Sequence, residues 1–79
     1  MTKVTDIRNN LPLIPGNARR IIEELFQRQR QWTRSQLITE VKRIHAERGG
    51  IEGNQDPSNV VTKALGYLQE DGKHFHVSQ

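Results

Sequence analysis

The sequence predicts a small, mostly α-helical domain with a minimal β element. Three segments place apolar residues at the spacing of an amphipathic helix, and the last residues alternate as in a strand. The chain has 79 residues and 33% hydrophobic residues, enough for one domain with a small core. It contains no cysteine, so aliphatic packing and not a disulfide or thiolate metal site must stabilise the fold.

Residues 1–17 are expected to form an irregular arm, of which the first ten or so are mobile, and residues 18–79 form the domain. Pro12 and Pro15 disfavour helical backbone in the residues before them, and Gly16-Asn17 indicates a turn. The first helix is predicted over about residues 18–30, with Asn17 as its N-cap. Its buried stripe is Ala18, Ile21, Ile22, Leu25 and Phe26.

The second helix is predicted to begin after an extended Trp32-Thr33. Thr33 and Gln36 have the spacing of a capping box, in which each side chain satisfies an unpaired amide of the first turn. Gly49-Gly50 ends the helix after Arg48. Its buried stripe is Leu37, Ile38, Val41 and Ile44.

The third helix follows a glycine-rich loop. Asp56 is its predicted N-cap, Pro57 suits the first helical position, and Gly72 ends it. The inner stripe is Val60, Val61, Ala64, Leu65 and Leu68. In the short strand that follows, Phe75 and Val77 share one face while His74 and His76 share the other.

Two segments, WTRSQLITEV and SNVVTKALGYLQEDGKHFHV, resemble the winged helix-turn-helix fold, and the likeness extends over about residues 18–77. The resemblance implies that the exposed face of the third helix enters the major groove of DNA. Residues 49–55 form a longer link than the three- or four-residue turn of the motif. The seven residues after Gly72 are too few for a two-stranded wing. The single strand is therefore expected to pair with Trp32-Thr33 or to be completed by another subunit.

The charge distribution is compatible with two interpretations. The net charge is +3, and residues 19–48 hold eight basic residues against four glutamates. Arginine suits phosphate because its planar fork donates two hydrogen bonds, but glutamate and arginine also pair along solvated helices. The third helix and its ends are net acidic, with Lys63 against Asp56, Glu70 and Asp71. If DNA binds, the basic first and second helices would therefore have to supply the electrostatic attraction to phosphate.

The predicted function is binding of double-stranded DNA, as a transcriptional or architectural regulator. The basic candidates for phosphate contacts are Arg34, Lys42, Arg43 and Arg48, and the candidates on the third helix are Ser58, Asn59, Thr62, Lys63 and Gly66. The alternative is a protein-interaction module that docks through this helix or through the apolar arm residues Leu11, Leu13 and Ile14. A homodimer is compatible with both. RNA binding is less favoured because no exposed aromatic platform is evident.

Other function classes lack support in the sequence. His74, His76 and His45 are possible metal ligands, but no residue has the spacing of the fourth ligand that a structural site needs. A polar strand face is therefore the favoured interpretation of the histidines, and no metal or cofactor is expected. The sequence has no cysteine, no serine beside a plausible base and no glycine-rich phosphate loop. An enzyme is therefore not expected. No apolar run is long enough to span a membrane and no secretory signal is present, so a cytoplasmic protein is expected.

Overall fold

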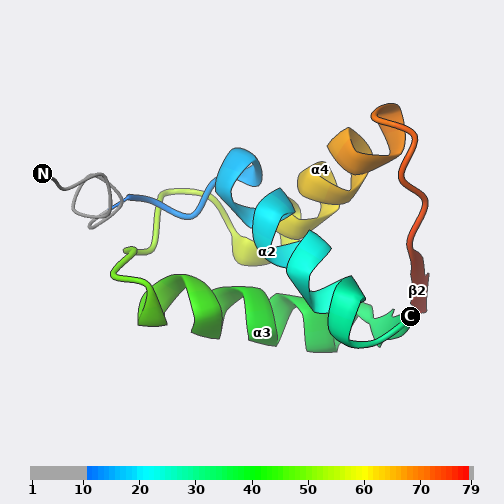
Figure 1. The fold of residues 1–79 in the computed structure, drawn as a ribbon. Coiled ribbons are helices and arrows are strands. Elements are labelled where there is room, and N and C mark those ends of the chain that lie inside the picture. The colour runs from blue at the N-terminus through cyan, green and yellow to red at the C-terminus, as the bar shows by residue number, and fades with distance from the viewer. Residues whose placement is uncertain (1–10, 79) are drawn as a thin grey trace, which may run out of the picture.

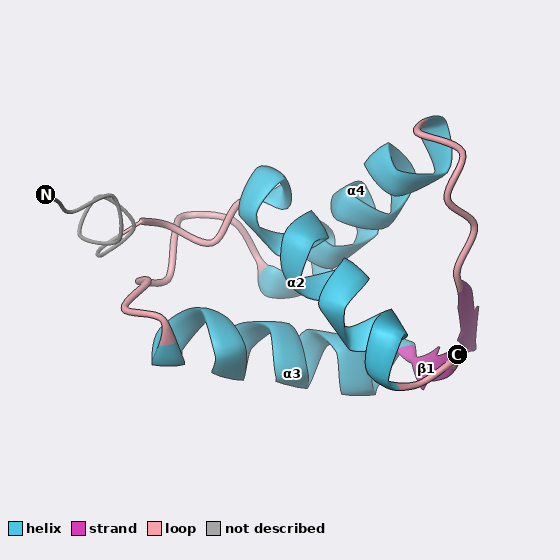
Figure 2. Ribbon diagram, in the orientation of Figure 1, coloured by secondary structure: helices cyan, strands magenta, loops and turns pink. Residues whose placement is uncertain are grey.

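The computed structural model describes residues 11–78, which form three helices and a two-stranded sheet (Figures 1 and 2). The helices are α2 (Pro15–Arg28), α3 (Arg34–Glu47) and α4 (Pro57–Glu70), and the strands are β1 (Gln31–Thr33) and β2 (His76–Ser78). The mostly α fold with a short C-terminal strand is confirmed. The expected mobility of the first ten residues lies outside the described part of the chain.

The first helix begins earlier than predicted. It starts at Pro15 and not at Ala18, because a proline at the first helical position has a suitable φ and lacks only an N–H that would be unbonded there. Asn17 therefore lies within the first turn of α2, and its side-chain Nδ2 donates to the Pro12 carbonyl oxygen at 2.8 Å instead of capping the helix. The helix also ends two residues early, at Arg28, because Gln29 is already extended.

The predicted caps of α3 and α4 are confirmed. The Thr33 hydroxyl accepts from the Gln36 amide and the Gln36 side chain accepts from the Thr33 amide, both at 3.1 Å. The Asp56 carboxylate accepts from the Ser58 amide at 2.9 Å, with Pro57 at the first helical position. Gly72 ends α4 with a φ of 86°, a left-handed conformation that glycine adopts readily.

One core joins the three helices. The buried stripes of all three contribute, together with Leu13 from the arm, and Phe26, Ile38 and Leu65 pack against them only partly buried. The Trp32 indole also packs against this core, and its Nε1 donates to the carbonyl oxygens of Leu25 and Gln29. The buried residues are Leu13, Ala18, Ile21, Ile22, Leu25, Leu37, Val41, Ile44, Val60, Val61, Ala64 and Leu68.

The sheet lies at one end of the molecule, where β2 returns beside β1 (Figure 2). The two strands are parallel, with Trp32 opposite Val77, so the predicted single strand does pair with the segment before α3. Phe75 and Val77 are half-buried while His74 and His76 are exposed, as the alternation predicted. The Phe75 ring stacks on Phe26 with centroids 4.4 Å apart.

At the opposite end, the arm lies beside the loop between α3 and α4 (Figure 1). Pro12 and Ile51 form an isolated parallel bridge, and the Ile51 amide donates to the Leu11 carbonyl oxygen at 2.8 Å. Leu13 is buried, so this part of the arm covers one end of the core.

Candidate nucleic-acid interface

One face of α4 is buried in the core, and the opposite face is exposed to solvent. Its inner stripe is completely buried except at Leu65, which is half-buried, and Asn59, Thr62 and Lys63 on the opposite side are exposed. Helical periodicity sets this division, because residues three and four apart share a face. The side of α4 that the sequence assigned to a partner is therefore accessible.

Gly66 lies near the middle of this outer face. A Cβ built at Gly66 would meet no heavy atom within 4 Å, so no contact in the described part of the chain excludes a side chain there. A glycine inside a helix costs about 0.5–1 kcal/mol relative to alanine. The packing of the domain therefore gives no reason for glycine at this position, whereas a surface that approaches the α4 backbone closely would give one.

Arg34, Ser58 and Thr62 form one hydrogen-bonded cluster between the first turns of α3 and α4. The Arg34 Nη2 donates to the Ser58 carbonyl oxygen at 3.0 Å, to Ser58 Oγ at 3.1 Å and to Thr62 Oγ1. The Thr62 hydroxyl in turn donates to the Ser58 carbonyl oxygen at 3.0 Å. This cluster fixes the start of α4 against α3.

The geometry of the cluster restricts what Arg34 can offer a phosphate. Both bidentate edges of a guanidinium, Nε with Nη2 and Nη1 with Nη2, use an Nη2 hydrogen. The Arg34 Nη2 already serves three acceptors on α4, so only single hydrogen bonds from Nε or Nη1 remain. Arg34 is placed to orient α4 more than to clamp a phosphate.

Arg43 and Arg48 are engaged in ion pairs elsewhere. Arg43 contacts Glu40 at 2.7 Å and Glu47 at 2.5 Å along α3, and Arg48 reaches across to Glu24 of α2 at 2.5 Å. Hydrogen bonding by Arg48 lowers the pKa of Glu24, partial burial opposes this effect, and the nearby charges of Arg48 and Arg28 lower the pKa further. The positive charges of Arg43 and Arg48 are thus balanced by glutamates on α2 and α3.

The Glu40 carboxylate belongs to the same surface. Its hydrogen bonds with Arg43 lower its pKa, and the pKa of Arg43 is raised by the same contacts. The positive excess that the sequence shows between residues 19 and 48 is therefore partly neutralised in the fold. Other arginines of this stretch, such as Arg20 and Arg30, remain exposed.

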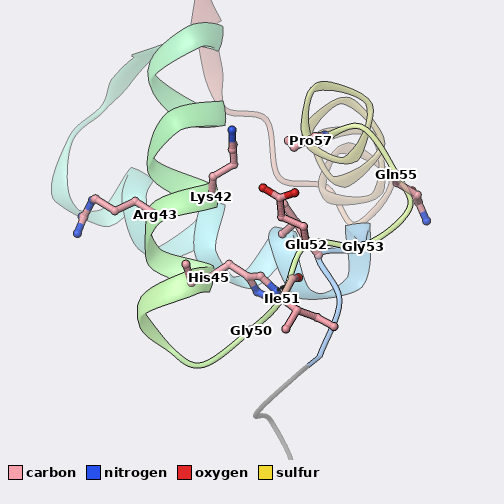
Figure 3. A pocket seen from close by; sticks show the side chains of 11 residues that line it. Lys42, Arg43, His45, Gly50, Ile51, Glu52, Gly53, Gln55 and Pro57 are labelled. Atoms are coloured by element: carbon pink, nitrogen blue, oxygen red, sulfur yellow. Dashed lines mark hydrogen bonds between the residues drawn. The ribbon is translucent and has the colours of Figure 1, made fainter.

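Lys42 and Lys63 are the predicted cations that remain available near α4. Both are exposed, and neither forms an ion pair with another residue in the 11–78 range. Lys42 leaves α3 toward the start of α4, whereas Arg43 leaves on the far side (Figure 3). The structure thus brings Lys42, but not Arg43, to the side of the molecule on which α4 begins.

Polar loop residues that were not predicted extend this surface. An open depression of about 470 Å³ beside the first turns of α4 is lined by Asn54, Gln55, Asp56, Asn59, Thr62 and Lys63. The amides of Asn54 and Gln55 add donors and acceptors, but the Asp56 carboxylate lowers the local positive potential. The sequence signal for these two residues was only their position next to the cap.

His45 has a structural position that the sequence interpretation missed. It is buried, and its Nε2 lies 2.9 Å from the Leu11 carbonyl oxygen and 3.1 Å from that of Ile51. Two carbonyl acceptors require that Nε2 carries a proton. The spacing of Leu37, Val41 and His45, four residues apart, would have placed the imidazole on the inner face.

Neither a metal centre nor a membrane span is evident within the described residues. Among them, no group of three or more histidine, aspartate or glutamate side chains is placed to hold a metal ion. None of the helices between residues 11 and 78 has the length and apolar character that a bilayer crossing demands.

Comparison with known proteins does not assign the chain to a family. No family model matches the chain, and neither the curated proteins nor the solved structures gave a match.

Proposed function

We propose that the protein binds double-stranded DNA through the outer face of α4, as a small transcriptional or architectural regulator. The observation that supports this best is the contrast across α4. Val60, Val61, Ala64 and Leu68 of its inner stripe are fully buried. Asn59, Lys63 and the unobstructed Gly66 lie together on the opposite side. A helix held this firmly loses little backbone conformational entropy on binding.

Each side chain of this face suits a distinct contact in the major groove. Asn59 can pair with the N6 and N7 edge of adenine, and Lys63 can reach guanine or a phosphate. The Thr62 hydroxyl is engaged with Ser58 and Arg34, so Thr62 would offer its methyl group to a thymine methyl. Gly66 would allow the α4 backbone to approach the groove closely.

The electrostatic contribution is expected to be modest. Lys63 lies on the α4 face and Lys42 extends from α3 toward the start of α4 (Figure 3), whereas Arg43 and Arg48 must first break ion pairs to contact phosphate. Non-specific binding at physiological salt is typically in the range of about 10⁻⁴–10⁻⁶ M. With few free cations, this domain is expected near the weak end of that range unless a second copy doubles the contacts.

Fluorescence anisotropy with a mixed-sequence duplex at several salt concentrations tests the proposal. Wild-type affinity should fall with salt, and Lys63→Gln should reduce the slope of log K against log salt by about 0.9, the value of one phosphate contact. Arg43→Gln removes the same charge from the opposite side of α3 and is the matched control. It should leave the slope unchanged.

Two results would contradict the proposal. One is the absence of binding at low salt with protein concentrations above about 10⁻⁴ M, the weak limit for non-specific complexes. The other is equal sensitivity to Lys63→Gln and Arg43→Gln, which would indicate attraction by net charge and not by the α4 face.

Tyr67 supports the second candidate, a protein-interaction module. It is 43% exposed and follows Gly66 on α4, and exposed aromatic residues are enriched at protein interfaces. In that case duplex DNA would not bind, and sedimentation equilibrium would test the simplest partner, a second copy. A concentration-dependent dimer that Tyr67→Ala abolishes would favour this candidate.

A further inference from the structure

A pocket of about 320 Å³ lies between the second half of α3, the arm and the α3–α4 loop (Figure 3). Its volume is at the lower end of the range for small-molecule sites, about 300–1,000 Å³. Since a water molecule occupies about 30 Å³ in the liquid, the pocket suits a ligand of roughly ten non-hydrogen atoms. The pocket lining shares Lys42 and Gln55 with the surface beside α4 but includes none of Asn59, Thr62, Lys63 and Gly66, and the inference does not depend on DNA binding.

The walls of the pocket are held in place by contacts within the fold. The Ile51 amide donates to the Leu11 carbonyl oxygen at 2.8 Å, and His45 Nε2 donates to the carbonyl oxygens of both residues. Gly53 packs closely on the arm, because a Cβ there would lie 3.1 Å from the Pro12 Cβ. The loop is therefore fixed to the arm and to α3, which holds the walls of the pocket in place.

The lining combines an apolar floor with two opposite charges. The apolar part comes from Leu13, Ala46, Ile51 and Pro57, and Ile51 is 49% exposed. The Lys42 ammonium and the Glu52 carboxylate both extend over the space between α3 and the start of α4 (Figure 3). They form no ion pair with each other within 4.0 Å. Arg43, the other basic residue of the lining, is occupied by Glu40 and Glu47.

We propose that this pocket binds a small apolar α-amino acid in its zwitterionic form. The ligand carboxylate would pair with Lys42, its ammonium group with Glu52, and its hydrocarbon side chain would cover the exposed Ile51. A ligand with a single charge would leave one of the two protein charges without a partner. The zwitterion is thus the small-molecule class that matches both charges and the apolar floor, and leucine has a suitable size.

An NMR titration of the full chain with L-leucine, followed by ¹⁵N–¹H correlation spectra, tests this assignment. A ligand of this size with two exposed ionic contacts is expected to bind with a Kd of about 1 mM. The amides of Ala46, Ile51 and Gly53 should shift. Two analogues, 4-methylpentanoate without the amine and 3-methylbutylamine without the carboxylate, should each bind about three- to fivefold more weakly.

Variants assign each charge to its partner. Glu52→Gln should reduce leucine affinity to that of 4-methylpentanoate and leave 4-methylpentanoate binding unchanged. Lys42→Gln should reduce leucine affinity to that of 3-methylbutylamine and leave 3-methylbutylamine binding unchanged. Glu70→Gln and Lys63→Gln make the same charge changes on α4, outside the pocket lining, and should alter neither affinity.

Either of two outcomes overturns the proposal. The first is the absence of shifts in the pocket amides at about 20 mM leucine, some twenty times the expected Kd. The second is equal affinity for leucine and both analogues, which would mean that the pocket selects only apolar bulk.

Discussion

Alanine at Gly66 should stabilise the protein, and alanine at Gly72 should destabilise it. A Cβ at either position would meet no heavy atom within 4 Å, so space does not distinguish the two glycines. Backbone conformation does, because Gly66 lies within α4 and Gly72 has a φ of 86°. Helix propensity favours alanine over glycine by about 0.5–1 kcal/mol, whereas left-handed backbone costs a residue with a Cβ about 1–2 kcal/mol.

Urea unfolding followed by circular dichroism measures both effects. Gly66→Ala should raise the midpoint without changing the m-value, and Gly72→Ala should lower it. For a domain of this size, the Gly66→Ala gain corresponds to a rise in Tm of about 2–8 °C. A loss of stability in Gly66→Ala would refute the reasoning, since it would mean that Gly66 is not in helical backbone or that a Cβ there meets another group.

If α4 contacts DNA as proposed, Gly66→Ala should also weaken binding while it stabilises the fold. A stability gain with lowered affinity separates a binding role from a folding role at the same position. Unchanged affinity would place Gly66 outside any close contact with DNA.

Two further changes test the packing of α3. Gly50→Ala should destabilise the protein by about 1–3 kcal/mol in urea unfolding, since the new Cβ would lie 2.2 Å from His45 Nε2 and force the ring from its carbonyl partners. Arg48→Gln should cost less than about 1 kcal/mol at pH 7, because both partners of the pair with Glu24 are exposed. The pKa of Glu24 is lowered from its usual value of 4.5, so this difference should be present above about pH 5 and should shrink on acidification toward pH 3.

The starts of α3 and α4 and the end of α4 were predictable because local chemistry determines them. Thr33 with Gln36, Asp56 with Pro57, and Gly72 act within one turn, so the sequence is sufficient. The start of α2 was wrong because Pro15 suits two roles, an arm residue that blocks helix before it and a first helical residue. Asn17 then found a partner in Pro12, which only the folded arm supplies.

The state of the basic residues was only partly predictable. Arg43 lies three and four residues from Glu40 and Glu47, so its pairing along α3 could have been inferred from the sequence. The pair of Arg48 with Glu24 joins two helices, and the contact of Arg34 with Ser58 depends on how α4 crosses α3. Such contacts follow from tertiary packing and cannot be predicted from the spacing of residues along one helix.

Chemical-shift mapping with a duplex DNA tests the central claim most directly, because it reports every amide of α3 and α4 in one experiment. The proposed interface predicts salt-sensitive shifts at Asn59, Lys63 and Gly66, with little change at Arg43. Shifts confined to the α2–α3 surface around Arg43, or none at low salt, would contradict the assignment of α4 as the DNA-binding helix.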